Sequence, residues 1–150
     1  MESLKSKKKN IVKILMEGQK NKNGIGSGLG NYLTAEILYR AKISPHKTLE
    51  EIYNDDALIK RLTKNIKYVL KLCFLTNKTG YMNHIEEHVK QIRKNIKSGK
   101  IKDYHKTVKI KDEEFCYYVY RKKTDPFDNK VIAEEIIKNR RMYWVPTVQK

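Results

Sequence analysis

Four of the seven glycines lie in the stretch Gly24-Ile-Gly-Ser-Gly-Leu-Gly30, directly before a segment with helical periodicity. A glycine-rich loop that leads into a helix presents unhindered backbone N–H groups at the positive end of the helix dipole, and such an arrangement binds phosphate oxygens. The loop ends in Gly30-Asn31-Tyr32, not in the Gly-Lys-Ser/Thr of a nucleotide P-loop. The preceding segment is helical in pattern, whereas a dinucleotide fingerprint needs a strand there. Spacing alone therefore leaves two interpretations, a phosphate site and a plain flexible loop.

A second motif, His84-Ile-Glu-Glu-His88, places two histidines four residues apart, where they could bind zinc with a glutamate as base. The motif lies in a Lys-rich helical segment that offers no third ligand, which favours solvated histidines paired with glutamates. Cys73 and Cys116 are single and far apart, so they form neither a disulfide framework nor a Cys-x-x-Cys metal site. We expect no cofactor, no metal and an intracellular protein.

The charge of the chain is strongly basic, with 33 Lys and Arg against 17 Asp and Glu and a formal net charge of +16. Such an excess favours a polyanionic partner, with nucleic acid first and an anionic membrane surface second. A solubilising charge mask is the alternative, although solvated faces usually mix both signs. Residues 1–10 form a basic arm, and no apolar run after them is long enough for a signal peptide or a membrane span.

Residues 11–75 have the pattern of a helical block. We expect a short helix that stops at Gly18, a second helix from Asn31 that ends by Ser44 because Pro45 follows, and a capping box at Thr48-Leu-Glu-Glu51. The capping box opens a helical turn over residues 49–53. A long helix capped by Asn54 or Asp55 follows, with apolar residues at helical spacing: Leu58, Leu62, Ile66, Val69, Leu70 and Leu72.

Residues 76–106 form a polar, Lys-rich connector with an amphipathic helix from Met82 to Ile96 and a break at Ser98-Gly99. Residues 107–150 have a different residue pattern, in which β-branched and aromatic residues roughly alternate: Val108, Ile110, Phe115, Tyr117, Val119, Val131, Ile132, Tyr143, Val145 and Val148. We predict turns at Asp125 to Asn129 and at Lys138 to Arg141. The expected fold class is mainly α with a small antiparallel β appendage.

Residues 28–45, Gly-Leu-Gly-Asn-Tyr-Leu-Thr-Ala-Glu-Ile-Leu-Tyr-Arg-Ala-Lys-Ile-Ser-Pro, resemble the helix-two-turn-helix signature of the formamidopyrimidine-DNA glycosylase and endonuclease VIII family of base-excision repair enzymes. Upstream, the segment Lys13-Ile-Leu-Met-Glu-Gly-Gln19 resembles the family's Lys-x-Leu-Leu-x-x-Gln. The resemblance implies that residues 11–75 form the DNA-binding helical domain. It also implies that the glycine turn with Gly28 and Gly30, together with Asn31 and Lys13, grips the phosphates flanking a damaged nucleotide.

The C-terminal segment resembles the finger of the same family, with residues 119–126 leading in and residues 140–149 leading out. Where zinc-binding members carry two pairs of cysteines, this chain has Phe127 with Lys130 and Val145 with Val148. The pattern resembles the family's zincless fingers, in which an apolar and aromatic hairpin core replaces the ion. The resemblance implies that Arg140 is the finger-tip arginine that holds phosphates by forked hydrogen bonds and that Arg141 assists it. An ordinary β-hairpin with a Trp144 core and no DNA role is the alternative.

The family's chemistry belongs to an N-terminal domain that begins, after Met removal, with Pro-Glu, whereas this chain begins Met1-Glu2-Ser3. The resemblance covers roughly residues 11–75 and 105–150, and it implies no catalytic residue in this chain. We expect a module that binds double-stranded DNA, with a separately encoded catalytic partner or without one, located with DNA in a nucleus, a nucleoid or a viral factory. The alternatives are a fragment or split subunit of an active glycosylase/AP lyase and a basic DNA-packaging component.

Overall fold

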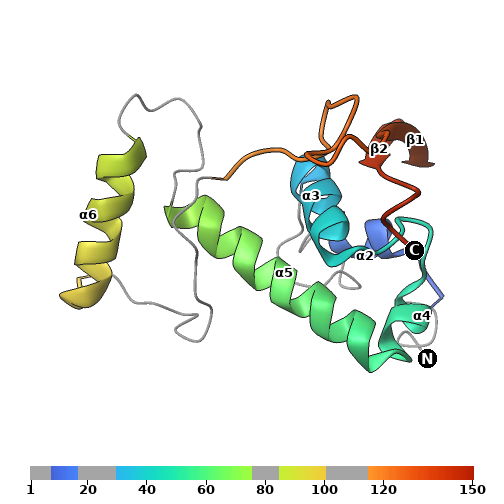
Figure 1. Cartoon of the computed structure of the whole chain (residues 1–150). Helices are drawn as coiled ribbons and strands as arrows, with labels where there is room; N and C mark the ends of the chain where they lie inside the picture. The colour runs from blue at the N-terminus through green and yellow to red at the C-terminus, as the bar shows by residue number, and fades with distance from the viewer. Residues whose placement is uncertain (1–7, 17–29, 76–84, 101–114) are drawn as a thin grey trace. The chain divides into compact units, whose positions relative to one another are not determined.

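The computed structural model describes residues 8–16, 30–75, 85–100 and 115–150. The chain separates into two compact units, one made of residues 1–63 with residues 117–150 and the other made of residues 64–116. The predicted fold class, mainly α with a small antiparallel β appendage, is confirmed (Figure 1). The elements in the described residues are α2 (Ile11–Met16), α3 (Asn31–Ala41), α4 (Leu49–Tyr53), α5 (Asp56–Leu75), α6 (Ile85–Lys97), β1 (Ile132–Ile137) and β2 (Arg140–Trp144).

Helix α2 is the predicted short apolar helix, and it is capped by Asn10. The Asn10 side-chain oxygen accepts the backbone N–H of Val12 at 2.8 Å, while its Nδ2 donates to the carbonyl of Pro45 at 2.6 Å. The backbone N–H of Ile11 also donates to the carbonyl of Lys47 at 2.8 Å. These bonds hold the start of α2 against the loop that follows α3.

Helix α3 ends where Pro45 predicts. Lys42 adopts a left-handed conformation with φ 58°, and its N–H donates to the carbonyl of Tyr39 at 3.0 Å. The next N–H, that of Ile43, donates to the carbonyl of Leu38 at 3.0 Å, so the end of the helix is closed by the paired bonds of a helix stop signal. Most of α3 is buried, from Thr34 to Tyr39 and again at Ala41.

The helices α4 and α5 follow the predicted pattern. The capping box is present, with the Thr48 side chain accepting the Glu51 N–H at 3.2 Å and the Glu51 carboxylate accepting the Thr48 N–H at 2.8 Å. Asp55 caps α5 by accepting the N–H groups of Ala57 and Leu58. Helix α6 occupies most of the helix predicted from Met82 to Ile96, although Met82 itself lies outside the described residues.

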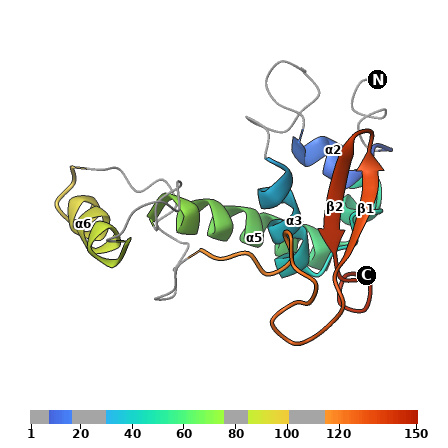
Figure 2. The ribbon, with the colours of Figure 1, turned by 90° about the horizontal axis from the view of Figure 1, so that it is seen from above.

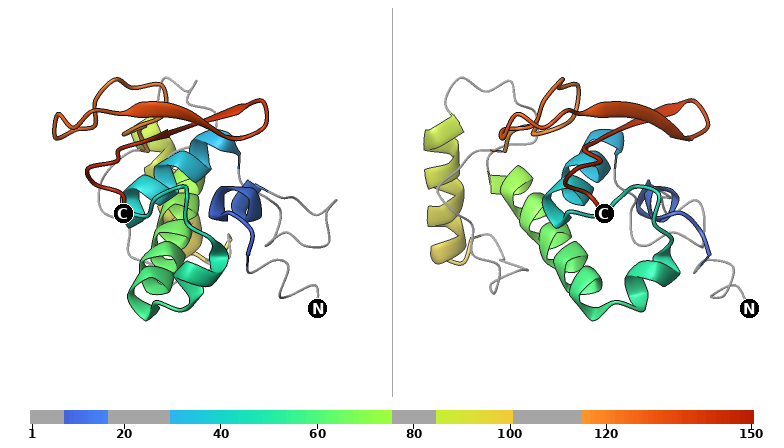
Figure 3. Two further views of the ribbon diagram at one scale, coloured as in Figure 1. Left: turned by 90° about the vertical axis from the view of Figure 1, so that its right-hand side faces the viewer. Right: turned by 45° about the vertical axis from the view of Figure 1, so that its right-hand side comes forward.

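Strands β1 and β2 form an antiparallel hairpin, closed by a turn in which Asn139 has φ 65°. Ile132 pairs with Trp144 and Glu135 pairs with Arg141, and a bulge between Glu135 and Ile137 shifts the register near the tip. Met142 on β2 is buried. Because β2 contacts α3 and β1 contacts α2, the hairpin lies across the two helices (Figures 2 and 3).

The alternating segment around Phe115, Tyr117 and Val119 was predicted as strand, and this prediction is wrong. The chain runs without regular structure from 115 to 131, apart from one isolated bridge between Thr124 and Lys130. The N–H groups of residues 118–120 bond a side chain of α3 instead of a neighbouring strand. Val145 and Val148 likewise lie in a turn, whereas Val108 and Ile110 lie outside the described residues.

The turn predicted at Asp125 to Asn129 is present, with the Asp125 N–H donating to the Asn129 carbonyl at 2.9 Å. The division of the chain into segments 1–10, 11–75, 76–106 and 107–150 stays a prediction. Contacts join residues from the second and fourth of these segments into one compact unit. This unit contains the candidate site.

Candidate nucleic-acid interface

No described side chain caps the N-terminus of α3. Gly30 is its N-cap, with extended backbone angles (φ −69°, ψ 167°) and no side-chain cap hydrogen bond. The Gly30 carbonyl accepts the Thr34 N–H at 3.0 Å, which begins the helical ladder. The N–H groups of the first turn therefore point from the positive end of the helix dipole, as an anion-binding helix start requires. Gly28, predicted to belong to the same turn, lies outside the described residues.

Asn31 joins this helix start to the hairpin. Its Nδ2 donates to the backbone carbonyl of Arg141 at 2.8 Å, across 110 residues of sequence. The hydrogen bond places the first residue of α3 beside the beginning of β2, where Arg140 and Arg141 are exposed. The predicted phosphate residues of the helical segment and of the finger thus lie together in one unit.

Lys13 is exposed on α2, and α2 contacts both α3 and β1. It therefore belongs to the same compact unit as Asn31 and Arg140. In the described part of the chain, no hydrogen bond or ion pair links Lys13 to the other predicted site residues. Its place in the site rests on the family resemblance.

Glu36 fixes the start of the finger to α3. This side chain is buried, and its carboxylate accepts three consecutive backbone N–H groups, those of Tyr118 (2.8 Å), Val119 (3.0 Å) and Tyr120 (2.9 Å). Burial raises the pKa of Glu36, although the three N–H groups act to lower it. One helical carboxylate therefore holds the backbone of the segment that leads into the finger.

Asp125 and Tyr39 make a second link one turn further along α3. The Tyr39 hydroxyl donates to Asp125 Oδ2 at 2.8 Å, and the other oxygen of Asp125 accepts the N–H groups of Phe127 and Asn129. Burial raises the pKa of the Tyr39 hydroxyl, and the Asp125 carboxylate raises it further. The turn that contains Phe127, at a position where zinc-binding members have a cysteine, is thus organised around a carboxylate.

Gln149 organises the other turn in the same way. Its side-chain oxygen accepts the Val145 N–H at 2.8 Å, and its Nε2 donates at 2.9 Å to the carbonyl of Ile43, which follows the end of α3. Val145 and Val148 stand where the second cysteine pair of zinc-binding members would be. Buried polar side chains, and not only the apolar core that the sequence predicts, therefore hold both turns of this finger.

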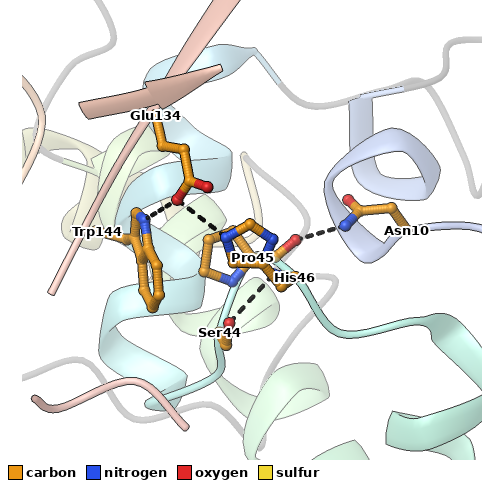
Figure 4. Close-up of polar contacts among 6 residues, drawn as sticks. All are labelled: Asn10, Ser44, Pro45, His46, Glu134 and Trp144. Atoms are coloured by element: carbon orange, nitrogen blue, oxygen red, sulfur yellow. Dashed lines mark hydrogen bonds and ion pairs between the residues drawn. The ribbon is translucent and has the colours of Figure 1, made fainter. Parts of the chain in front are cut away.

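The base of the hairpin is anchored to the loop after α3 by Glu134. One oxygen of its carboxylate accepts the Trp144 indole N–H at 3.0 Å and lies 2.9 Å from His46 Nε2, and the His46 and Trp144 rings pack edge to face at 5.3 Å (Figure 4). The hydrogen bond with His46 lowers the pKa of Glu134. Trp144 is thus bonded to a carboxylate at the base of the hairpin.

Sequence reasoning missed these buried polar residues. The only signal for Glu36 was its position within the Ala-x-Glu-x-Leu part of the resemblance. The turn predicted at Asp125 to Asn129 did not show that the Asp125 carboxylate organises it, and Gln149 appeared only as the end of the finger segment in the resemblance. His84 lies outside the described residues, and the side chain of His88 is not described. Among the side chains that the structure does describe, no group of three or more His, Cys, Asp or Glu could hold a metal ion. The same residues contain no helix long and apolar enough to cross a membrane.

Residues 106–150 match the family model of the formamidopyrimidine-DNA glycosylase C-terminal domain. The predicted resemblance is confirmed. Similar solved structures include a viral DNA glycosylase (22% identity, TM-score 0.63), which matches over 99% of this chain and 42% of that chain. Lactococcus lactis Fpg (MutM) in complex with DNA containing N7-benzyl-Fapy-dG is also similar (18% identity, TM-score 0.62), over 99% and 45% of the two chains. No curated protein sequence matches the chain.

The fold is therefore that of the C-terminal part of a formamidopyrimidine-DNA glycosylase, with the helix-two-turn-helix segment and a finger. The chain spans less than half the length of these solved structures.

Proposed function

We propose that the chain binds double-stranded DNA by gripping its phosphate backbone between the start of α3 and the tip of the hairpin. The observation that carries this proposal is the 2.8 Å hydrogen bond from Asn31 to the Arg141 carbonyl. It brings together two segments that the family resemblance assigns separately to phosphate binding. The Lactococcus lactis Fpg structures with the same fold are complexes with DNA, which supports DNA as the partner.

The charge around the hairpin supports the same partner. Among the exposed cations of this unit, seven lie in the segment before the hairpin and at its tip: Arg121, Lys122, Lys123, Lys130, Lys138, Arg140 and Arg141. Guanidinium groups donate forked hydrogen bonds to phosphate, while each backbone N–H group at a helix start can donate one hydrogen bond to a phosphate oxygen. Such contacts position a protein on the backbone without reading the bases, so binding should depend little on sequence.

The test is the affinity of the chain for a duplex, measured by fluorescence anisotropy. A hydrogen bond to a charged group contributes about 1.5–3 kcal/mol, so Arg140→Ala should weaken binding by roughly tenfold to a hundredfold. Asn31→Ala should weaken it somewhat less. Lys94→Ala, which removes an exposed cation of α6, is the matched control and should change affinity much less.

The salt dependence gives a second measure. With about four to six phosphate contacts, log K should fall against log salt with a slope of roughly −3.5 to −5.5, and Arg140→Ala should make that slope shallower by about one. If Arg140→Ala and Asn31→Ala bind as the parent does while Lys94→Ala fails, the binding is a generic effect of basic surface. A slope near zero would exclude a phosphate grip altogether.

The coverage of the solved structures favours a second proposal, that the chain supplies one part of a glycosylase/AP lyase. The chain matches 42% of the viral DNA glycosylase. We expect the isolated chain to bind an abasic-site duplex without cleaving it. Cleavage only after a chain with a Pro-Glu terminus co-purifies would support the split enzyme, whereas cleavage by the chain alone would contradict the assignment of no catalytic residue.

A further inference from the structure

Four tyrosines form one ring cluster beside the candidate interface. The Tyr120 ring lies at its centre, with centroid distances of 5.3 Å to Tyr117, 5.4 Å to Tyr143 and 6.0 Å to Tyr32. Tyr32 and Tyr117 also contact each other edge to face at 5.8 Å. The rings come from α3, from the segment before the hairpin and from β2, and we name them the tyrosine cluster.

The tyrosine cluster is partly open to solvent. Tyr32 is 38% exposed and Tyr117 is 41% exposed, while Tyr120 and Tyr143 are half-buried. Aromatic side chains bury a large apolar area when they are covered, so leaving several of them partly exposed has a cost in free energy. A contiguous group of partly exposed rings therefore indicates an interaction surface. The partner must offer flat apolar surface to these rings.

The groups around the tyrosine cluster are cationic or hydrogen-bond donors. The Arg121 guanidinium lies 5.3 Å from the centroid of Tyr120. Tyr32 follows Asn31 directly, and the alternation of β2 places the side chains of Arg141 and Tyr143 on the same face. Rings flanked by phosphate-binding groups suit a ligand that joins a flat base to a phosphate, which is a nucleotide of a nucleic acid strand.

We propose that the tyrosine cluster is a stacking surface for unpaired bases of a DNA strand whose phosphates the interface holds. Bases paired within a duplex are already stacked on their neighbours, so only an unpaired base can leave the stack to meet the rings. Every base has an aromatic face, so this stacking tolerates any sequence. The inference rests on the proposed phosphate grip and adds to it the kind of strand that the grip prefers.

The test compares two single strands of equal length and equal charge, an oligothymidylate and a fully abasic oligonucleotide. Stacking on an aromatic side chain strengthens binding by roughly fivefold to a hundredfold per base. The parent should therefore bind the oligothymidylate at least about fivefold more tightly than the abasic strand. The preference should persist as salt is raised, because both strands carry the same phosphates. Affinity is measured by competition against a labelled duplex.

Variants locate the effect. Tyr32→Leu and Tyr117→Leu keep apolar bulk but remove the ring, so each should reduce the preference for the oligothymidylate at least fivefold and change duplex affinity much less. Because each ring also contacts other rings of the cluster, the melting temperature of each variant is measured to confirm that the fold is retained. Tyr32→Phe and Tyr117→Phe keep the ring and should retain the preference. Tyr53→Leu is the matched control, because Tyr53 is a 61% exposed tyrosine of α4 outside the cluster.

Two results separate the failure of this inference from the failure of the proposed function. If the parent binds duplex with the expected salt slope but binds both single strands equally, the tyrosine cluster takes no base and its partner is of another class, such as a protein segment. If the phenylalanine variants lose the preference, ring stacking is excluded. If neither duplex nor single strand binds, the phosphate grip itself is wrong.

Discussion

Glu36 shows how one buried charge can determine the course of a distant backbone segment. A carboxylate placed inside a protein is costly unless hydrogen bonds replace its water, and here three successive N–H groups do so. Because burial leaves the pKa of Glu36 above its ordinary value of 4.5, the folded chain binds this proton more tightly than the unfolded chain does. The contribution of Glu36 to the free energy of unfolding therefore grows as the pH falls through the raised pKa of the folded chain toward 4.5.

Glu36→Gln should destabilise the protein by about 1–3 kcal/mol. The amide keeps one acceptor oxygen but turns an NH₂ group toward a backbone N–H, so at least one buried donor loses its partner. The free energy of unfolding from urea titration at neutral pH measures this. Glu50→Gln, at an exposed residue of α4, should change it by less than about 0.5 kcal/mol. Equal losses for the two variants would show that the three hydrogen bonds contribute nothing specific.

Gly30→Ala should leave the fold intact but weaken DNA binding. The backbone of Gly30 has a negative φ, and an added Cβ would meet nothing closer than the Tyr32 ring at 3.5 Å, an ordinary contact. A methyl group at the helix start would, however, hinder a phosphate from reaching the first N–H groups. Thermal melting and duplex affinity are the two measurements. If Gly30→Ala binds duplex DNA as tightly as the parent does, the phosphate does not bind at the start of α3.

At the scale of elements, the finger is held by hydrogen-bonded turns. The turn at Asp125 depends on a carboxylate that accepts from Asn129, Tyr39 and Phe127, and the turn at Val145 depends on the Gln149 amide. Although burial acts to raise the pKa of Asp125, the hydrogen bonds hold it below its ordinary value of 3.8. The charged form is therefore the one that the fold stabilises.

Asp125→Asn should destabilise the protein at neutral pH, and the difference from the parent should shrink in acid. Since the pKa of Asp125 is lower in the folded than in the unfolded chain, its contribution is complete above about pH 4 and is lost as the pH falls further. Urea midpoints of parent and variant across pH 3 to 7 would measure this. Asp128→Asn, at an exposed neighbour, is the control. A difference that stays constant with pH would contradict the charge-dependent explanation.

Much of the element order could be predicted from local rules. Pro45 predicts the end of α3, and the Thr48 and Glu51 capping box predicts α4, because these signals act within a few residues. The strand predicted around Tyr117 is wrong because alternation of apolar residues cannot show that the N–H groups bond a carboxylate more than 80 residues away. Only the family resemblance indicated that Asn31 and Arg141 lie close together.

At the scale of the whole molecule, the finger should need no ion. We predict no bound zinc by elemental analysis and no change in melting temperature on adding a chelator. The reason is that the side-chain oxygens of Asp125 and Gln149 accept backbone N–H groups and so close both turns where metal ligands stand in zinc-binding members. Stoichiometric zinc, or melting on chelation, would overturn this. Such a result would make His84 and His88 candidate zinc ligands.

The bonds that join the two parts of the first compact unit also set an order of events in folding. Those from Glu36, Ile43 and Asn31 reach partners 82 to 110 residues ahead in sequence. During synthesis, the Glu36 carboxylate and the Ile43 carbonyl therefore lack these partners until the segment up to Gln149 has been made. Such long closures slow folding, because the loop entropy is lost before the contacts form.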